Sequence, residues 1–411
     1  MLHRNVTPPA ETINEELTLD VEKLVYGGDG LARNDRHVVF LPQVLPGEQV
    51  RARLTEKRSQ LARAEAIEIL RPSEERIAPP CPHFGECGGC HYQHARYGYQ
   101  TSQKVEILRE VLKRVGKLDS PEEIKVITGP EFGYRNRAQF HFDGGAIGYH
   151  EEGSRSVAAI ENCAVLSPKL QESLAALKRM MKDKRFPNFL RVMELFTNET
   201  EVQLNVLRAD KPVARRFFDW CAEEIPGMVP GPLNYSAAGF EFRVSHNAFF
   251  QVNRFLVDAL VEESLSGAEG ESAIDLYSGV GLFALPLAKR FPNTGAVESG
   301  TMAWRDLQHN ATQAKMAVRC HQASAEDFLA GSDASADFIL ADPPRSGLGK
   351  HAVSRLLVAR PRQLTLVSCN PATMARDLAA LLPAYELTSM VMLDLFPQTY
   401  HLETVVRLSL R

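Results

Sequence analysis

The chain has no apolar run that approaches the roughly 20 residues of a membrane-spanning helix, so we expect no membrane segment. Residues 1–16 lack the apolar core of a secretory signal, which predicts a cytoplasmic protein. Internal repeats and low-complexity tracts are also absent, which argues against a repeat architecture or disordered bulk. What remains is a chain of 411 residues, 44% hydrophobic and 24% charged, long enough for two or three globular domains.

Positive charge is not in excess either. The 47 Lys and Arg residues are outnumbered by 51 Asp and Glu residues, which gives a net charge of −4 and a pI near 6.3. Domains that bind nucleic acid usually carry a basic surface, so the overall composition argues mildly against such a partner. Only a local basic patch would support one.

Cysteine is scarce, and its seven residues are an odd number, which does not suit a disulfide framework. Three of them lie within ten residues, flanked by Pro and Gly, and a fourth thiol further on would complete a four-cysteine site. These residues are Cys81, Cys87, Cys90 and Cys163. The spacing fits a structural zinc ion and an iron–sulfur cluster equally well. A neighbouring histidine, His91 or His94, is an alternative fourth ligand.

The N-terminal part of the chain has the pattern of an all-β domain. Alternating or apolar runs at residues 17–21, 36–41, 49–55 and 64–70 are separated by turn residues, among them Gly27-Gly28-Asp29-Gly30. About five short strands in such a length are typical of a small closed barrel of the OB type, a fold that often binds nucleic acid.

The middle of the chain reads as an α+β segment. Residues 101–116 have the apolar spacing of one amphipathic helix, and residues 201–207 read as a strand. Arg135 and Arg137 would point to the same face of a strand, where they could grip phosphate or simply face solvent.

From Ser272 onward the pattern is βαβα, which predicts an α/β domain. A strand runs into a glycine turn with Gly279 and Gly281, followed by a helix at residues 282–290, and Glu298 ends the next strand 23 residues after Asp275. That spacing suits hydrogen bonds from a carboxylate to the ribose of a nucleoside cofactor, and the turn favours S-adenosylmethionine over NAD.

Cys369 lies between the apolar run at residues 363–367 and a helix that Asn370 and Pro371 cap. A helix N-terminus stabilises an anion, so this position favours a thiol pKa below the usual value of about 8.5 and a thiolate nucleophile. Taken alone, however, a single Cys at the end of a buried strand is more often a small core residue. Strand 337–341 delivers Asp342 to the same sheet edge. Because ligands of such sheets bind outside the carboxyl ends of the strands, we expect Asp275, Glu298, Asp342 and Cys369 to converge there.

Several motifs carry a family resemblance that covers nearly the whole chain. Gly28-Asp29-Gly30-Leu31-Ala32 and Leu45-Pro46-Gly47-Glu48 resemble the TRAM domain, an RNA-binding barrel. The motifs of the C-terminal half resemble the RumA/TrmA family of RNA uracil-C5 methyltransferases; they are Asp275-Leu276-Tyr277-Ser278-Gly279-Val280-Gly281, Asp342-Pro343-Pro344-Arg345, Ser368-Cys369-Asn370-Pro371 and His401-Leu402-Glu403-Thr404.

The resemblance implies three domains: a TRAM-like OB-fold barrel over residues 1–72, a central α+β iron–sulfur domain over residues 73–248, and a Rossmann-like class I methyltransferase domain over residues 249–411. It implies S-adenosylmethionine as cofactor, with contacts from Gln251, Tyr277, Glu298, Asp342 and Ser324. Two positions depart from the family: Leu282 stands where relatives have Asn, and Ser324 stands where Asn is frequent.

The resemblance also implies that the four-cysteine site holds a structural [4Fe–4S] cluster, with Cys81, Cys87, Cys90 and Cys163 as ligands. Barrel and cluster together resemble the branch that modifies ribosomal RNA, which implies 23S ribosomal RNA as substrate. We also expect a monomer.

The chemistry requires a nucleophile, because uracil C5 is too weak a carbon nucleophile to attack the methyl donor by itself. Cys369 would add to C6, and Glu403 would later remove the C5 proton, with His401 as the next candidate base. The target uridine has to leave its stack. Two other hypotheses stay open: a cytosine-C5 or amino methyltransferase, and a non-catalytic iron–sulfur RNA-binding protein.

Overall fold

The computed structural model describes residues 15–34, 37–331 and 335–411. The chain divides into two compact units. The first comprises residues 1–85, 90–107 and 398–400, and the second comprises residues 86–89, 108–397 and 401–411. Among the described residues, no helix is both long and apolar enough to cross a membrane.

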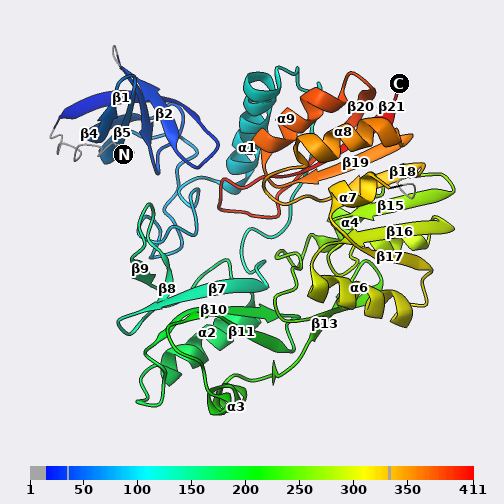
Figure 1. The fold of residues 1–411 in the computed structure, drawn as a ribbon. Helices are drawn as coiled ribbons and strands as arrows, with labels where there is room; N and C mark the ends of the chain where they lie inside the picture. Colours follow the sequence, from blue (N-terminus) through cyan, green and yellow to red (C-terminus); the bar gives the residue numbers. More distant parts are fainter. Residues whose placement is uncertain (1–14, 35–36, 332–334) are drawn as a thin grey trace, which may run out of the picture. The chain divides into compact units, whose positions relative to one another are not determined.

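The first unit contains the predicted barrel. Its strands close in the order β1-β2-β3-β5-β4 (Figure 1), and their bounds are β1 (Glu16–Leu24), β2 (Gly30–Arg33), β3 (Val38–Leu41), β4 (Gln49–Arg58) and β5 (Leu61–Arg71). Alternate side chains such as Leu19, Val21 and Val50 fill its core, as the period-two pattern predicts. Position 36, where the sequence suggested that a strand begins, lies outside the described residues.

The predicted helix at 101–116 is also present. It comprises α1 (Tyr97–Val111) and a π-helical turn, η1 (Leu112–Gly116), which ends at Lys117 in the left-handed conformation.

The second unit contains a six-stranded sheet in the order β12-β11-β10-β7-β8-β9. The strands are β7 (Arg137–Asp143), β8 (Ala146–His150), β9 (Val157–Ala159), β10 (Leu190–Thr197), β11 (Val202–Ala209) and β12 (Met228–Val229). Two helices, α2 (Pro168–Met180) and α3 (Arg215–Glu224), pack on one face through a shared apolar core that includes Leu174, Leu195 and Trp220.

The sequence predicted that Arg137 either binds phosphate or faces solvent, and the structure contradicts both interpretations. Strand β7 lies between β10 and β8, and Arg137 is only 7% exposed. Its Nη1 donates to the carbonyl of Ala248 at 2.8 Å, and its guanidinium lies 4.2 Å from the centre of the Phe196 ring. Arg135 precedes the strand and donates to the carbonyl of Arg137. Arg137 therefore holds the interior together and faces neither solvent nor phosphate.

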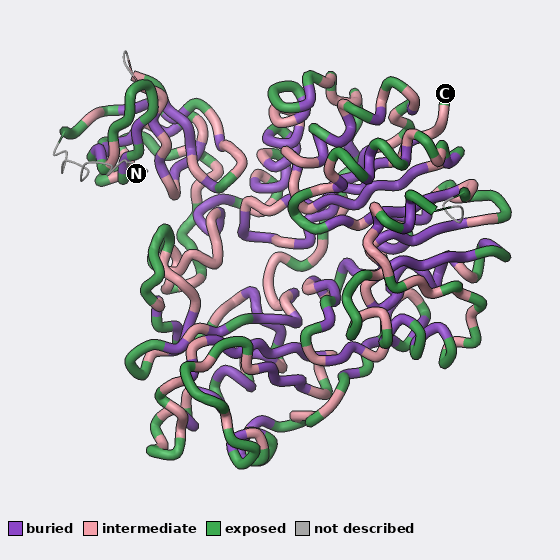
Figure 2. The backbone as a smooth tube through the Cα atoms, viewed as in Figure 1, coloured by how far each residue is buried: buried purple, intermediate pink, exposed green. Residues whose placement is uncertain are grey.

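The same unit contains an eight-stranded sheet in the order β17-β16-β15-β18-β19-β21-β20-β6. The strands are β15 (Ser272–Leu276), β16 (Asn293–Glu298), β17 (Val318–Gln322), β18 (Phe338–Ala341), β19 (Gln363–Ser368), β20 (Tyr385–Leu393), β21 (Glu403–Leu410) and β6 (Lys125–Ile127). β15 to β19 are parallel, whereas β21 enters antiparallel between β19 and β20. The central strands β15, β18 and β19 are buried along most of their length (Figure 2).

Helices connect these strands, as the βαβα pattern predicts. They are α4 (Val257–Ser264), α5 (Ala284–Ala288), α6 (Thr301–Gln313), α7 (Ala325–Leu329), α8 (Gly349–Ala359) and α9 (Pro371–Leu381). The hairpin of β13 (Leu233–Ala237) and β14 (Phe240–Val244) contributes Tyr235 and Phe242 to the apolar core of this sheet.

Candidate active site

The strand register brings the predicted site residues to one edge of the eight-stranded sheet. Leu276 pairs with Val297 on one side and with Ala341 on the other, and Ala341 pairs with Leu366. The residues that follow these pairs therefore lie beside one another at the carboxyl ends of the parallel strands. They are Tyr277, Glu298, Asp342 and, beyond the last pair, Cys369.

Strand β21 brings Glu403 to Cys369. Because Ser368 pairs with Thr404 in antiparallel register, the next residue of β19 and the preceding residue of β21 lie across from each other. These two residues are Cys369 and Glu403. The charges of Asp342 and Arg345 act on both of them.

The local structure around Cys369 agrees with the sequence prediction. Strand β19 ends at Ser368, and α9 begins at Pro371. The Asn370 side chain accepts hydrogen bonds from the amides of Ala372 and Thr373 at 3.0 and 3.4 Å, which satisfies free donors of the first turn. Cys369 is thus held in a tight connection between a buried strand and a capped helix.

The predicted low pKa of this thiol is wrong. Burial raises the pKa of Cys369 to about 11, and the charges of Glu403 and Asp342 contribute to the rise. Arg345 opposes it, but only in part. With a pKa of about 11, Cys369 is therefore a thiol at neutral pH.

The two acidic residues beside Cys369 have raised pKa values as well. Glu403 is 5% exposed, and burial, followed by the charge of Asp342, raises its pKa well above the usual value. Burial raises the pKa of Asp342 to about 7. Buried carboxyl groups with raised pKa values that share one edge of a sheet are typical of acid–base sites.

The glycine turn after β15 has the features of a nucleoside cradle. Tyr277 and Gly279 have φ angles of +63° and +54°, and a Cβ atom on Gly279 would meet no atom within 4 Å. The backbone is therefore open to a ligand there. The Glu298 carboxylate accepts hydrogen bonds from the amides of Gly279 and Gly300 at 2.9 and 2.6 Å, which fixes it beside the turn.

Asp275 lies beneath this turn at the end of β15 and is fully buried. Neither of its carboxylate oxygens has a hydrogen bond of ordinary geometry within the part of the chain that the structure describes. Burial and the neighbouring Asp342 raise the pKa of Asp275 well above the usual value.

The remaining predicted cofactor contacts occupy different environments. Gln251 is 7% exposed and follows Phe250 in the segment before α4. Ser324 caps α7: its hydroxyl accepts from the amide of Asp327 at 3.0 Å and lies 2.8 Å from the Asp327 carboxylate. Leu282, which stands in place of Asn, is buried in the apolar core.

His401, the alternative candidate for the base, has its ring edge-on to the ring of Phe396, with the two ring centroids 5.6 Å apart. Arg345 received no role from the sequence, yet it is the only cation whose charge lowers the pKa of both Cys369 and Glu403 among the causes resolved for the described residues. The Asp-Pro-Pro-Arg motif indicates that Arg345 is near the site, but a sequence motif does not show on which residues the charge of the side chain acts.

The four cysteines of the predicted cluster are divided between the two units. Cys81 and Cys90 belong to the first, and Cys87 and Cys163 belong to the second. All four are of intermediate exposure. Over residues 15–34, 37–331 and 335–411 there is no group of three or more His, Cys, Asp or Glu side chains arranged to hold a metal ion. The iron–sulfur site therefore stays a prediction.

Comparison with known proteins adds independent findings. Residues 228–411 match the family model of tRNA (uracil-5-)-methyltransferases, and residues 10–67 match the TRAM domain. A 23S rRNA (uracil(1939)-C(5))-methyltransferase of Vibrio parahaemolyticus is 31% identical over 94% of each chain. An RNA methyltransferase of Aquifex aeolicus is 30% identical over 97% of this chain and 99% of its own.

Among solved structures, the fold is similar to that of the tRNA (uracil-54, C5)-methyltransferase of Pyrococcus abyssi in complex with S-adenosyl-L-homocysteine. The TM-score is 0.74 at 26% identity, and the match covers 95% of this chain and 100% of that one.

Proposed function

Because the chain belongs to the family of RNA uracil-C5 methyltransferases, we propose that it methylates C5 of a uridine in RNA with S-adenosylmethionine as donor. One observation carries the proposal: the antiparallel entry of β21 sets Glu403 across from Cys369, beside Asp342. A nucleophile and a base at one sheet edge are the two groups that this reaction requires.

Each residue has a defined role. The Cys369 sulfur forms a bond to C6 of uracil, and the electron pair of the C5–C6 double bond makes C5 a nucleophile. S-adenosylmethionine, when bound, would supply the electrophilic methyl group that becomes bonded to C5, and S-adenosylhomocysteine would be the leaving group. Glu403 then takes the proton from C5, the double bond re-forms, and the sulfur leaves C6.

The raised pKa values suit these roles. An ionised Glu403 is a stronger base than an exposed glutamate, because its environment favours the protonated form. The Cys369 thiol must lose its proton before or during the addition, since its pKa is about 11. Arg345, whose positive charge lowers that pKa, favours the step.

The residues of the glycine turn fit the cofactor. Glu298 would bind the ribose hydroxyls, as its spacing from Asp275 predicts, and Gln251, Tyr277, Asp342 and Ser324 are the further proposed contacts. The open space above Gly279 supports the approach of a ligand to the backbone. A solved relative of similar fold binds S-adenosyl-L-homocysteine, the product of such a reaction.

We propose 23S ribosomal RNA as the substrate, because several relatives of 30–32% identity carry the name 23S rRNA (uracil(1939)-C(5))-methyltransferase. The division into a barrel over residues 1–72, a central domain over 73–248 and a methyltransferase domain over 249–411 remains part of the proposal. The TRAM match supports RNA binding by the barrel.

The decisive experiment incubates the protein with unmodified 23S rRNA, unmodified tRNA and labelled S-adenosylmethionine, followed by nucleoside analysis. We expect 5-methyluridine in 23S rRNA. Label in 5-methylcytidine or in an amino-methylated base would refute the proposal, and 5-methyluridine in tRNA alone would refute the choice of RNA.

A variant pair then tests the two residues. Glu403→Gln keeps the nucleophile but lacks the base, so it should accumulate a methyl-labelled protein–RNA complex that survives a denaturing gel. Cys369→Ala should form neither complex nor product, and the double variant should form no complex. Turnover of Glu403→Gln at the wild-type rate would assign the base to another residue, with His401 next.

We also propose that Cys81, Cys87, Cys90 and Cys163 hold a structural [4Fe–4S] cluster, supported by their spacing in the sequence. Anaerobically purified protein should contain about four irons and four sulfides per chain. Cys163→Ser should lose them, whereas Cys320→Ser, a partly buried cysteine of β17, should not. Stoichiometric zinc without sulfide would overturn the proposal.

A further inference from the structure

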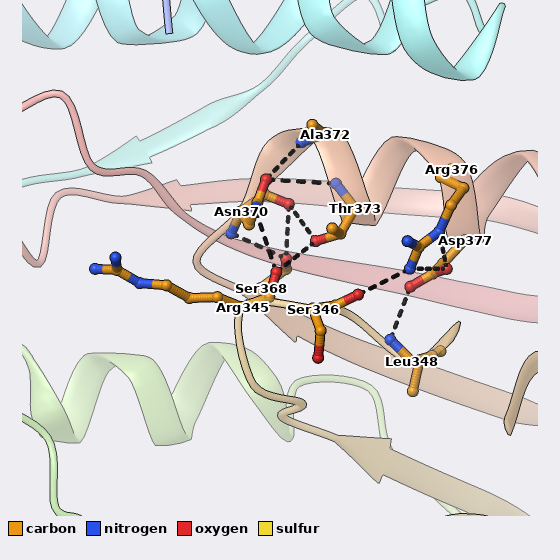
Figure 3. A network of polar contacts seen from close by, with 9 residues as sticks. All are labelled: Arg345, Ser346, Leu348, Ser368, Asn370, Ala372, Thr373, Arg376 and Asp377. Atoms are coloured by element: carbon orange, nitrogen blue, oxygen red, sulfur yellow. Dashed lines mark hydrogen bonds and ion pairs between the residues drawn. The ribbon is translucent and has the colours of Figure 1, made fainter. Parts of the chain in front are cut away.

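The loop between β18 and α8 carries Asp342 and Arg345 and contains no helix or strand of its own. Its single internal backbone hydrogen bond among the described residues runs from the amide of Gly347 to the carbonyl of Pro344, at 2.8 Å. The other polar groups of its second half are held by side chains of α9, the helix that follows Cys369 (Figure 3).

The first turn of α9 holds the carbonyl of Arg345. The Asn370 Nδ2 and the Thr373 hydroxyl each donate to it at 3.2 Å. Asn370 also caps the helix, so one side chain joins the helix start to the loop.

The second turn holds the rest of the loop through an adjacent charged pair. Oδ2 of Asp377 accepts the amide of Leu348 at 2.8 Å, and Oδ1 accepts Nε and Nη2 of Arg376 at 2.9 and 2.8 Å. Nη2 of Arg376 also donates to the carbonyl of Ser346 at 2.9 Å. Asp377 is only 4% exposed, and its hydrogen bond with the Leu348 amide is buried, whereas the Arg376 side chain is partly exposed.

The glycine at position 347 is required by this contact. Its φ is +77°, and a Cβ atom would lie 2.5 Å from Oδ2 of Asp377 and 2.9 Å from Nη2 of Arg376. Loop and helix therefore approach more closely than any residue with a side chain would allow.

We infer that Asp377 and Arg376 are positioning residues, which hold the loop of Asp342 and Arg345 in register with Cys369. The inference rests on the proposed function for its catalytic consequence. In Figure 3 the Arg345 side chain extends away from the Asp377 contacts, while its backbone carbonyl is held by Asn370 and Thr373. The hydrogen bonds of Asp377 go to the Leu348 amide and to Arg376, so Asp377 acts on the site through the loop.

The test uses Asp377→Asn in the full-length protein. Asparagine keeps the size and one acceptor for the Leu348 amide, but it loses the charged pair with Arg376. The matched control is Asp337→Asn, because Asp337 accepts the amides of Glu271 and Ser272 at the opposite end of β18. Both variants remove a carboxylate that accepts hydrogen bonds from backbone amides, but Asp337 holds the start of β15 and not the loop of Asp342 and Arg345.

We expect Asp377→Asn to lower kcat for methyl transfer roughly 10- to 100-fold, the cost of a displacement of about 1 Å, with KM for both substrates nearly unchanged. Alkylation of Cys369 by iodoacetamide should shift to lower pH, because a loosened loop holds neither loop charge near the thiol, and the charge of Asp342, which raises the pKa of Cys369, outweighs that of Arg345, which lowers it. Asp337→Asn should change neither quantity. Gly347→Ala should reproduce the Asp377→Asn result.

Equal kcat in Asp377→Asn and Asp337→Asn, or an unchanged pH dependence of alkylation, would overturn the inference. Should Asp377→Asn fail to fold, Arg376→Lys serves instead, since it keeps the charge but cannot reach Asp377 and Ser346 with one planar group. Alkylation needs no methyl transfer, so the loop role is tested even where the wild-type protein makes no 5-methyluridine.

Discussion

The reactivity of Cys369 gives the sharpest test of the site. A thiol of pKa about 8.5 is about 10% ionised at pH 7.5. The pKa of Cys369 is about 11, so its thiolate fraction at that pH is about 300-fold smaller. A more basic thiolate is more nucleophilic, with a slope of about 0.45 per pKa unit, which returns a factor of roughly 13. The net expectation is alkylation about 20-fold slower than that of an ordinary thiol.

The assay is iodoacetamide labelling of Cys369 from pH 6.5 to 11, followed by mass spectrometry of its peptide. The reference is the same cysteine in urea-unfolded protein. Restricted access would slow the reaction at every pH, whereas a raised pKa moves the midpoint, so the midpoint decides. Glu403→Gln should move the midpoint down, because the Glu403 charge is the second cause of the rise. A change at exposed Glu386 of β20, Glu386→Gln, should leave it in place. A wild-type midpoint at or below 8.5 would refute the reasoning and show that the helix N-terminus outweighs burial.

Three further outcomes follow from the same geometry. Glu403→Gln should raise the free energy of unfolding, and the gain measured by thermal denaturation should grow from pH 5 to pH 8. The reason is that the folded protein holds the proton of Glu403 more tightly than the unfolded chain does, because the folded pKa is raised. The stability of the wild-type protein therefore falls as the pH rises above the unfolded pKa. Gly281→Ala should cost about 1–3 kcal/mol in urea unfolding, because its φ is +100° and a Cβ atom would lie 2.8 Å from Leu307; Gly133→Ala, with φ +63° and open space, should cost less. Glu298→Gln should weaken S-adenosylmethionine binding about tenfold by calorimetry, since it loses a charge-assisted acceptor, and unchanged affinity would remove Glu298 from the cofactor site.

Short sequence patterns correctly predict the secondary-structure elements that depend only on neighbouring residues. The barrel strands follow from alternation, and the β19–α9 boundary follows from the Asn370 cap and Pro371. Long-range pairing was not visible in the same way. Strand β6 joins the eight-stranded sheet beside β20, more than 250 residues later in the chain, and no property of the three residues 125–127 indicates that partner.

Alternation also failed to identify which face of a strand is covered. It placed Arg135 and Arg137 on one face, but the packing of Phe196 and Ala248 decides that Arg137 is interior. Glu403 was assigned by family resemblance, because its partner across the sheet is 34 residues away and reaches it only through the antiparallel register of β21. The site is therefore a product of strand order as much as of motif.

The pKa of Cys369 shows why a correct local prediction gave a wrong chemical one. A helix N-terminus favours an anion by about 0.3–1 kcal/mol, less than one pKa unit, since a unit corresponds to about 1.4 kcal/mol. The rise from 9.0 to about 11 has the opposite sign and is larger. Its causes are burial, Glu403 and Asp342, all of which depend on the tertiary structure. The sequence predicts the helix start correctly, but the field of the helix is too weak to determine the protonation state of a partly buried thiol on which two carboxyl groups act.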